Sequence, residues 1–139
     1  MKKLITTFTA TLLASSVSAQ PDKDWWACQV VHVSGMNWEN NQWVTRTFSN
    51  STPFVLMSDG NGSLTKESAS KLLDVSDREV KCKVSPYKKR VICADGFGGN
   101  AFFDTEAAKG GVSKIYGSVT VETDHRDSIF VKAFECVKG

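Results

Sequence analysis

Residues 79–95, EVKCKVSPYKKRVICAD, contain two of the four cysteines and the clearest strand–turn–strand pattern of the chain. Apolar and charged residues alternate in residues 79–84, and residues 90–95 return after a central turn, which indicates two paired strands with one buried face. If Cys82 lies opposite Cys93, Val84 lies opposite Val91 and all four side chains share that face. This register predicts a hairpin closed by a Cys82–Cys93 disulfide.

Short apolar stretches separated by turn-forming residues continue on both sides of this hairpin. Their spacing predicts eight strands, at residues 26–33, 43–48, 54–57, 79–84, 90–95, 100–104, 114–122 and 128–137. We expect residues 34–42 to form a loop, and residues 105–112 to form a loop or a single helical turn. Apolar residues recur at helical spacing only in residues 65–73, which predicts one short helix.

Short connections favour antiparallel pairing of consecutive strands. The sequence therefore predicts an all-β fold of about eight antiparallel strands, arranged as an up-and-down, lipocalin-like barrel with one short helix. A two-sheet β-sandwich is the alternative. In a closed barrel the first and last strands become neighbours, so the barrel also predicts a Cys28–Cys136 disulfide.

The N-terminal 19 residues have the composition of a secretory signal peptide. Lys2 and Lys3 precede a mostly apolar run, and small residues at positions 17 and 19 fit a cleavage site before Gln20. We expect residues 1–19 to be removed and residues 20–139 to form a single disulfide-bonded β domain, exported to the periplasm or secreted. No later segment is apolar enough to predict a transmembrane span.

The expected mature chain has no net charge. The whole chain has 17 Lys and Arg residues against 15 Asp and Glu, and two of the lysines precede Gln20 while no acid does. Fifteen residues of each sign remain, so the overall charge gives no attraction to nucleic acid. No cofactor and no metal site are predicted, because the cysteines lack the spacing of zinc ligands and an even number in an exported chain favours disulfides.

Residues suited to catalysis are few, and the sequence predicts that the chain is not an enzyme. His32 lies within a predicted strand, and His125 lies in a charged turn without a paired nucleophile. Asp95 and Asp104 flank a glycine-rich turn and would form a carboxylate pair if they faced each other.

Two groups of residues are candidates for binding. Trp38 lies among asparagines in the expected loop 34–42, where an aromatic ring beside amides suits contact with a sugar or a protein. Tyr87, Lys88, Lys89 and Arg90 form a basic, aromatic hairpin tip suited to an anionic surface.

These features lead to three functional hypotheses. The first is an exported binding module with a protein or glycan partner outside the cytoplasm, such as an inhibitor of, or an immunity protein against, an extracellular or periplasmic enzyme. The second is a carrier of a small apolar ligand inside the barrel, which a cavity lined by Phe102, Phe130 or Phe134 would favour. The third is a small hydrolase.

Overall fold

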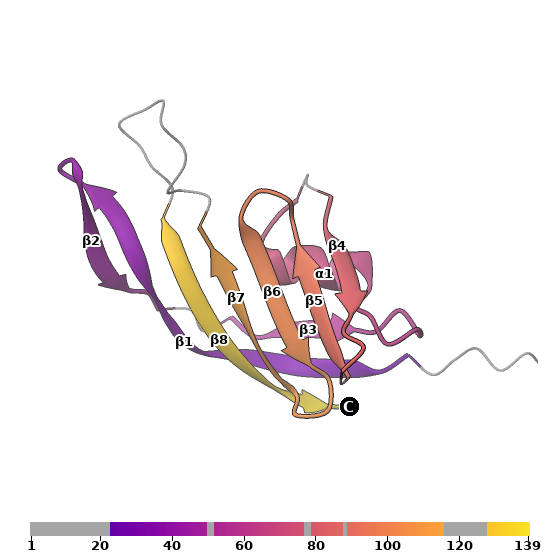
Figure 1. Cartoon of the computed structure of the whole chain (residues 1–139). Coiled ribbons are helices and arrows are strands. Elements are labelled where there is room, and N and C mark those ends of the chain that lie inside the picture. The colour runs from indigo at the N-terminus through magenta and orange to yellow at the C-terminus, as the bar shows by residue number, and fades with distance from the viewer. Residues whose placement is uncertain (1–22, 50–51, 77–78, 88, 116–127) are drawn as a thin grey trace, which may run out of the picture.

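The structure is a computed structural model that describes residues 23–49, 52–76, 79–87, 89–115 and 128–139. Within these ranges the chain forms eight strands and one helix (Figure 1). They are β1 (Trp25–Glu39), β2 (Gln42–Thr47), β3 (Phe54–Met57), α1 (Lys66–Leu73), β4 (Lys81–Val84), β5 (Arg90–Ala94), β6 (Gly99–Asp104), β7 (Lys109–Lys114) and β8 (Ile129–Lys138). The expected signal peptide, Lys88, His125 and most of the expected strand at 114–122 lie outside the described residues.

All eight strands belong to one antiparallel sheet in the order β2-β1-β8-β7-β6-β5-β4, with β3 paired to β1 as well. One edge of the long β1 pairs with β3 over its first part and with β2 over its last part, and its other edge pairs with β8. The nearly all-β fold of antiparallel strands with one short helix is confirmed, whereas the two-sheet sandwich is wrong for the described strands. No pairing among the described residues joins β4 to β2 or β3, so this sheet is open.

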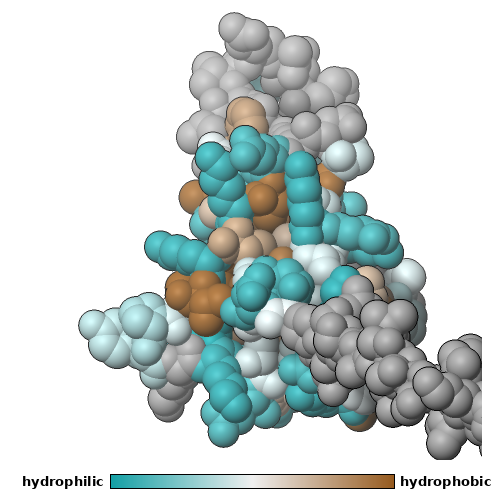
Figure 2. All heavy atoms as spheres, turned by 90° about the vertical axis from the view of Figure 1, so that its right-hand side faces the viewer, coloured by the Kyte–Doolittle hydropathy of each residue, from teal (hydrophilic) through white to brown (hydrophobic). Residues whose placement is uncertain are grey.

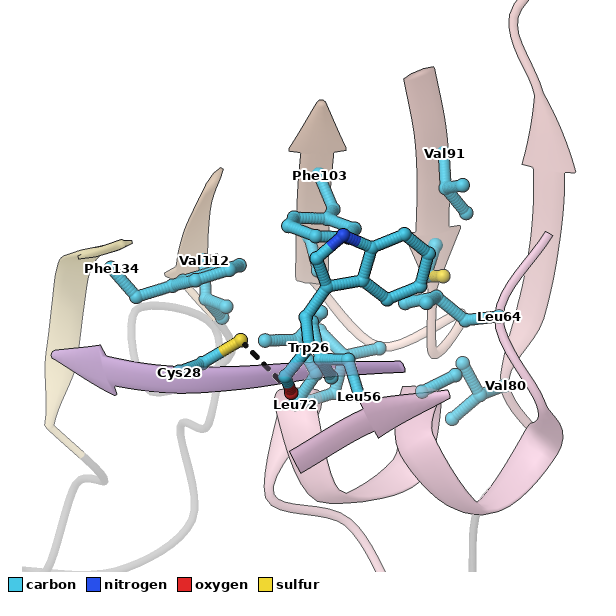
Figure 3. Close-up of a cluster of buried hydrophobic side chains, with 14 of the residues drawn as sticks. Trp26, Cys28, Leu56, Leu64, Leu72, Val80, Val91, Phe103, Val112 and Phe134 are labelled. Carbon is cyan, nitrogen blue, oxygen red and sulfur yellow. Dashed lines mark hydrogen bonds between the residues drawn. The ribbon is translucent and has the colours of Figure 1, made fainter. Parts of the chain in front are cut away.

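The inner face of the sheet is covered by β3 and α1, which packs against β3, β6 and β7 (Figure 1). Trp26 occupies the centre of the core, with its ring edge-on to Phe103 at a centroid distance of 5.1 Å (Figure 3). Phe103 in turn stacks on Phe134 at 5.9 Å. Other fully buried side chains come from β3, α1 and β5 and include Leu56, Leu72, Leu73, Val91 and Cys93.

Helix α1 begins at a side-chain cap and is anchored to β3. The Thr65 Oγ1 accepts a hydrogen bond from the Ser68 backbone N–H at 3.2 Å, which satisfies one of the free donors at the helix start. The Ser68 hydroxyl accepts a second bond, from the backbone N–H of Met57 at 2.8 Å. The helix ends at Asp74, whose φ of 53° places it in the left-handed region.

Two disulfides join neighbouring strands, Cys82 with Cys93 and Cys28 with Cys136. Cys82 lies opposite Cys93 between β4 and β5, in the register that also places Val84 opposite Val91. Cys28 lies opposite Cys136 between β1 and β8. The Cys28 sulfur is 3.7 Å from the Trp26 carbonyl oxygen (Figure 3), a packing contact, since a disulfide sulfur carries no hydrogen.

The expected loop at residues 34–42 is wrong, because β1 continues to Glu39 and β2 begins at Gln42. Asn40 and Asn41 form a two-residue turn with positive φ angles of 49° and 62°, a conformation that asparagine tolerates and that matches the twist of a hairpin. Cross-strand pairing of Trp38 with Trp43 continues the ladder up to this turn.

The expected loop or helical turn at residues 105–112 is also wrong in its second half, because Lys109–Lys114 is strand β7. One of its two glycines, Gly110, has a packing role. A Cβ at Gly110 would overlap the ring of Phe134 and the carbonyl oxygen of Phe102, so the glycine lets the aromatic core approach the strand.

We expect the two disulfides to differ in their contribution to stability. They close segments of 11 and 108 residues, and chain entropy predicts stabilisation of about 3 kcal/mol for the shorter loop and about 5 kcal/mol for the longer. Replacing Cys82 and Cys93 together by alanine should therefore lower the unfolding free energy less than replacing Cys28 and Cys136. Urea unfolding without reductant measures both, and an equal or reversed order would contradict the prediction.

Replacing Gly110 by alanine should destabilise the fold by about 1–3 kcal/mol, because the added methyl group has to displace the Phe134 ring or the backbone of β6. Gly111 is the matched control. A Cβ there would meet only the Lys132 carbonyl oxygen, at 3.2 Å, so Gly111→Ala should have a smaller effect. Equal losses of thermal stability in the two variants would show that Phe134 does not require the glycine.

Candidate binding sites

The tip of the β4–β5 hairpin carries the most exposed large side chain among the described hydrophobic residues. Tyr87 is 87% exposed, although a tyrosine ring usually buries much of its surface. The Ser85 N–H donates to the Arg90 carbonyl oxygen at 2.7 Å, which joins the two strands at the base of the tip. The hairpin therefore presents an aromatic ring to solvent beyond a hydrogen-bonded base.

The two described basic residues of this tip have different surroundings. The Arg90 Nε donates to the Asp104 Oδ2 at 3.1 Å, and its guanidinium lies 5.5 Å from the Phe102 ring. A hydrogen bond from the backbone N–H of Ala107, together with the one from Arg90, lowers the pKa of Asp104. Arg90 therefore stabilises the β5–β6 ladder, and its charge is matched within the chain.

Lys89 lies at the edge of a cavity of about 260 Å³. Its backbone carbonyl oxygen accepts bonds from the Thr105 N–H at 2.9 Å and the Thr105 hydroxyl at 2.7 Å. The start of β1, the loop after β3 and the hairpin supply the walls, which include Asp24, Trp26, Ser58, Gly62, Val84 and Lys89. Lys89 is thus the predicted binding residue that the structure places beside a cavity.

The surface around this hairpin carries both charged and hydrophobic side chains. Figure 2 shows the side of the molecule that carries β4, where extended hydrophilic side chains stand beside small hydrophobic patches. Lys81 and Lys83 are exposed on β4, and Val84 is 42% exposed. The combination of lysines, Val84 and Tyr87 offers both charged and apolar contacts.

Trp38 is not part of this surface. It is partly buried in β1 and packs edge-on against Trp43, with ring centroids 5.3 Å apart. The strand pairings place it at the other end of the sheet. Arg90 lies opposite Asp104, and the residues paired in turn across β7 and β8 lead from Asp104 to Gln29 on β1. Trp38 lies nine residues beyond Gln29. The structure therefore separates the two predicted binding groups.

The residues considered for catalysis do not come together. His32 is exposed beside an irregularity in the β1–β8 pairing. Asp95 and Asp104 do not face each other: Asp104 lies opposite Arg90, whereas Asp95 follows the far end of β5. The Asp95 Oδ1 instead accepts bonds from the backbone N–H groups of Phe97 and Gly99, at 2.8 and 2.9 Å, and so shapes the β5–β6 turn.

Neither a metal cluster nor a membrane helix is found in the described part of the chain. No three His, Cys, Asp or Glu side chains there are grouped so as to hold a metal ion. No helix in the same residues has the length and apolar character required to cross a bilayer.

Sequence reasoning missed Lys132, a lysine on the inner face of the sheet. It lies between Val33 on β1 and Val112 on β7, both of which are buried, and only 9% of its own surface is exposed. The signal was present in β8, where alternation places Lys132 on the same face as Phe134. A charged residue at a core position is rare unless it is paired or functional.

Lys132 borders a second cavity, of about 340 Å³. The cavity lies beside the part of β1 between its pairing with β3 and its pairing with β2, where Val30 lines it together with Thr52 and Pro53. Its walls include Val30, Pro53, Phe54, Leu72, Asp74 and Lys132. No hydrogen bond or ion pair links the Lys132 ammonium to another described residue.

Burial lowers the pKa of Lys132 from its ordinary value of 10.5, because the charged ammonium loses hydration. The nearby Lys114 on β7 lowers this pKa further, whereas the Asp74 carboxylate at the end of α1 opposes the shift. Lys71 also borders the cavity, but it forms an ion pair with Glu67 at 3.1 Å. The cavity is thus lined by a largely buried lysine side chain whose charge the protein surroundings compensate only in part.

Lys132→Met should stabilise the protein at neutral pH by about 1–2 kcal/mol, because it keeps the apolar stem and removes a poorly solvated charge. The unfolded chain binds this proton up to pH 10.5, whereas the folded chain releases it at lower pH. The wild type should therefore gain stability relative to the variant as pH rises from the lowered pKa to 10.5. Urea unfolding at pH 7 and at alkaline pH tests this, and a constant difference would contradict it.

Comparison with protein-family models, with curated protein sequences and with solved structures finds no match for this chain.

Proposed function

We propose that the chain is an exported binding module that recognises a protein or glycan partner outside the cytoplasm through the tip of the β4–β5 hairpin. The observation that carries this proposal is the position of Tyr87, which is 87% exposed on a hairpin whose Lys89 borders a cavity. Exposed tyrosines are frequent anchors at binding interfaces, since the ring offers a large apolar surface and a hydrogen-bonding hydroxyl.

The strands of the hairpin are cross-linked within the chain. The Cys82–Cys93 disulfide joins its two strands, and the Ser85–Arg90 hydrogen bond closes its turn. Two hydrogen bonds from Thr105 fix the backbone of Lys89 from a neighbouring loop. A surface ordered in advance loses less conformational entropy on binding, which favours affinity.

The charge of the tip favours an anionic region of the partner. The Arg90 charge is matched by Asp104, but no ion pair within the described residues occupies Lys89. Lys83 adds a further exposed positive charge on β4. An aromatic ring beside uncompensated lysines suits recognition of an acidic protein surface, as an inhibitor or immunity protein requires, or of an acidic glycan.

The carrier hypothesis has less support from the geometry. Phe134 is packed in the core against Phe103, whereas Phe102 lies on the outer face and is 40% exposed. A closed barrel would need a pairing of β4 with β2 or β3, which the described residues lack. The hydrolase hypothesis and the prediction that the chain is not an enzyme both stay untested.

A pull-down from periplasmic and extracellular extracts tests the proposal. The domain of residues 20–139 should capture a partner, and Tyr87→Ala combined with Lys89→Glu should reduce capture at least tenfold, because both contacts lie at the tip. Arg90 is left intact, since its loss would break the Asp104 ion pair.

Lys66→Glu is the control, because it applies the same charge reversal to an exposed lysine on α1 that forms no ion pair with another described residue. It should leave capture unchanged. Undiminished capture by the tip variant would show that Tyr87 and Lys89 do not take part in binding. Equal losses of capture in both variants would indicate a non-specific effect of charge. Unfolding curves for all variants establish that they are folded.

A further inference from the structure

We propose that the cavity beside Lys132 binds a small organic monoanion, a carboxylic acid with a short apolar body. This site shares no lining residue with the cavity at the hairpin tip, so it does not depend on the proposed partner recognition. The position of Lys132, the chemistry of the walls and the size of the space all favour such a ligand.

The ammonium is the group that a ligand would satisfy. Lys132 is buried on the inner face between two valines, and no described residue forms a hydrogen bond or ion pair with it. A buried charge without a partner is costly, and a bound anion removes much of that cost. A carboxylate would supply both the opposite charge and hydrogen-bond acceptors.

The other charged groups near Lys132 favour an anion with a single charge. Lys114 on β7 adds positive charge, Asp74 at the end of α1 adds one negative charge, and the Lys71 charge is matched by Glu67. A multiply charged phosphate would meet the Asp74 carboxylate with too few cations to compensate both. One carboxylate fits the small positive excess.

The remaining walls are suited to an apolar group. Val30, Phe54 and Leu72 contribute hydrocarbon surface from β1, β3 and α1. The volume of about 340 Å³ lies near the lower limit of known ligand sites, which measure ~300–1,000 Å³. The ligand would place its carboxylate at Lys132 and its short apolar body against these side chains.

Titration calorimetry with hexanoate, 1-hexanol and inorganic phosphate as probes tests the proposal. Hexanoate should bind with measurable heat, and the alcohol and phosphate should bind at least tenfold more weakly. Lys132→Met should weaken hexanoate binding at least tenfold, because a charge-assisted hydrogen bond is lost. Lys109→Met, which removes a lysine on the exposed surface, should have no effect.

Asp74→Asn provides a variant with the opposite expected result. It removes the competing carboxylate, and asparagine accepts the left-handed backbone at this position, where φ is 53°. Hexanoate should bind severalfold more tightly to this variant. Absence of hexanoate binding, equal binding of hexanol, equal or tighter binding of phosphate, or unchanged affinity in Lys132→Met would each overturn the proposal.

Discussion

The pairing of the first strand with the last determines how the rest of the chain is arranged. The β1–β8 ladder extends from Trp26 to Met36 on β1 and is closed by the Cys28–Cys136 disulfide. On one side β1 holds β2 and β3, and on the other β8 holds β7 and the strands beyond it. Without this ladder the inner face would divide into two small apolar surfaces, neither of which could form a core around Trp26.

The elements that the sequence predicted well are those whose information is local. The β4–β5 register follows from alternation and from one pair of cysteines 11 residues apart, so it needs no knowledge of distant partners. Helix α1 likewise follows from the helical spacing of its apolar residues. The sequence could not predict that the described sheet is open. The pairing of β3 with β1 and the packing of α1 on the inner face both join segments that are distant in the sequence.

The errors arise where a distant residue decides the local structure. Residues 34–39 have a loop-like composition, yet they form a strand because β2 pairs with all of them along one edge and β8 pairs with residues 34–36 along the other. Gly110 resembles a loop residue in the sequence, but it is a strand residue whose missing side chain leaves room for the Phe134 ring. The candidate site shows the same division: local composition identified Tyr87 and Lys89, but only strand register shows that Trp38 lies at the opposite end of the sheet.

Lys132 is a residue that the fold does not need. Its neighbours on both adjacent strands are valines, and a hydrophobic side chain of similar length would fit the same space. Stability alone would favour such a replacement, whereas ligand binding would preserve the charge. Homologues that bind the proposed anion should have lysine or arginine at this position. Homologues that share the fold but do not bind the anion should have methionine or leucine there.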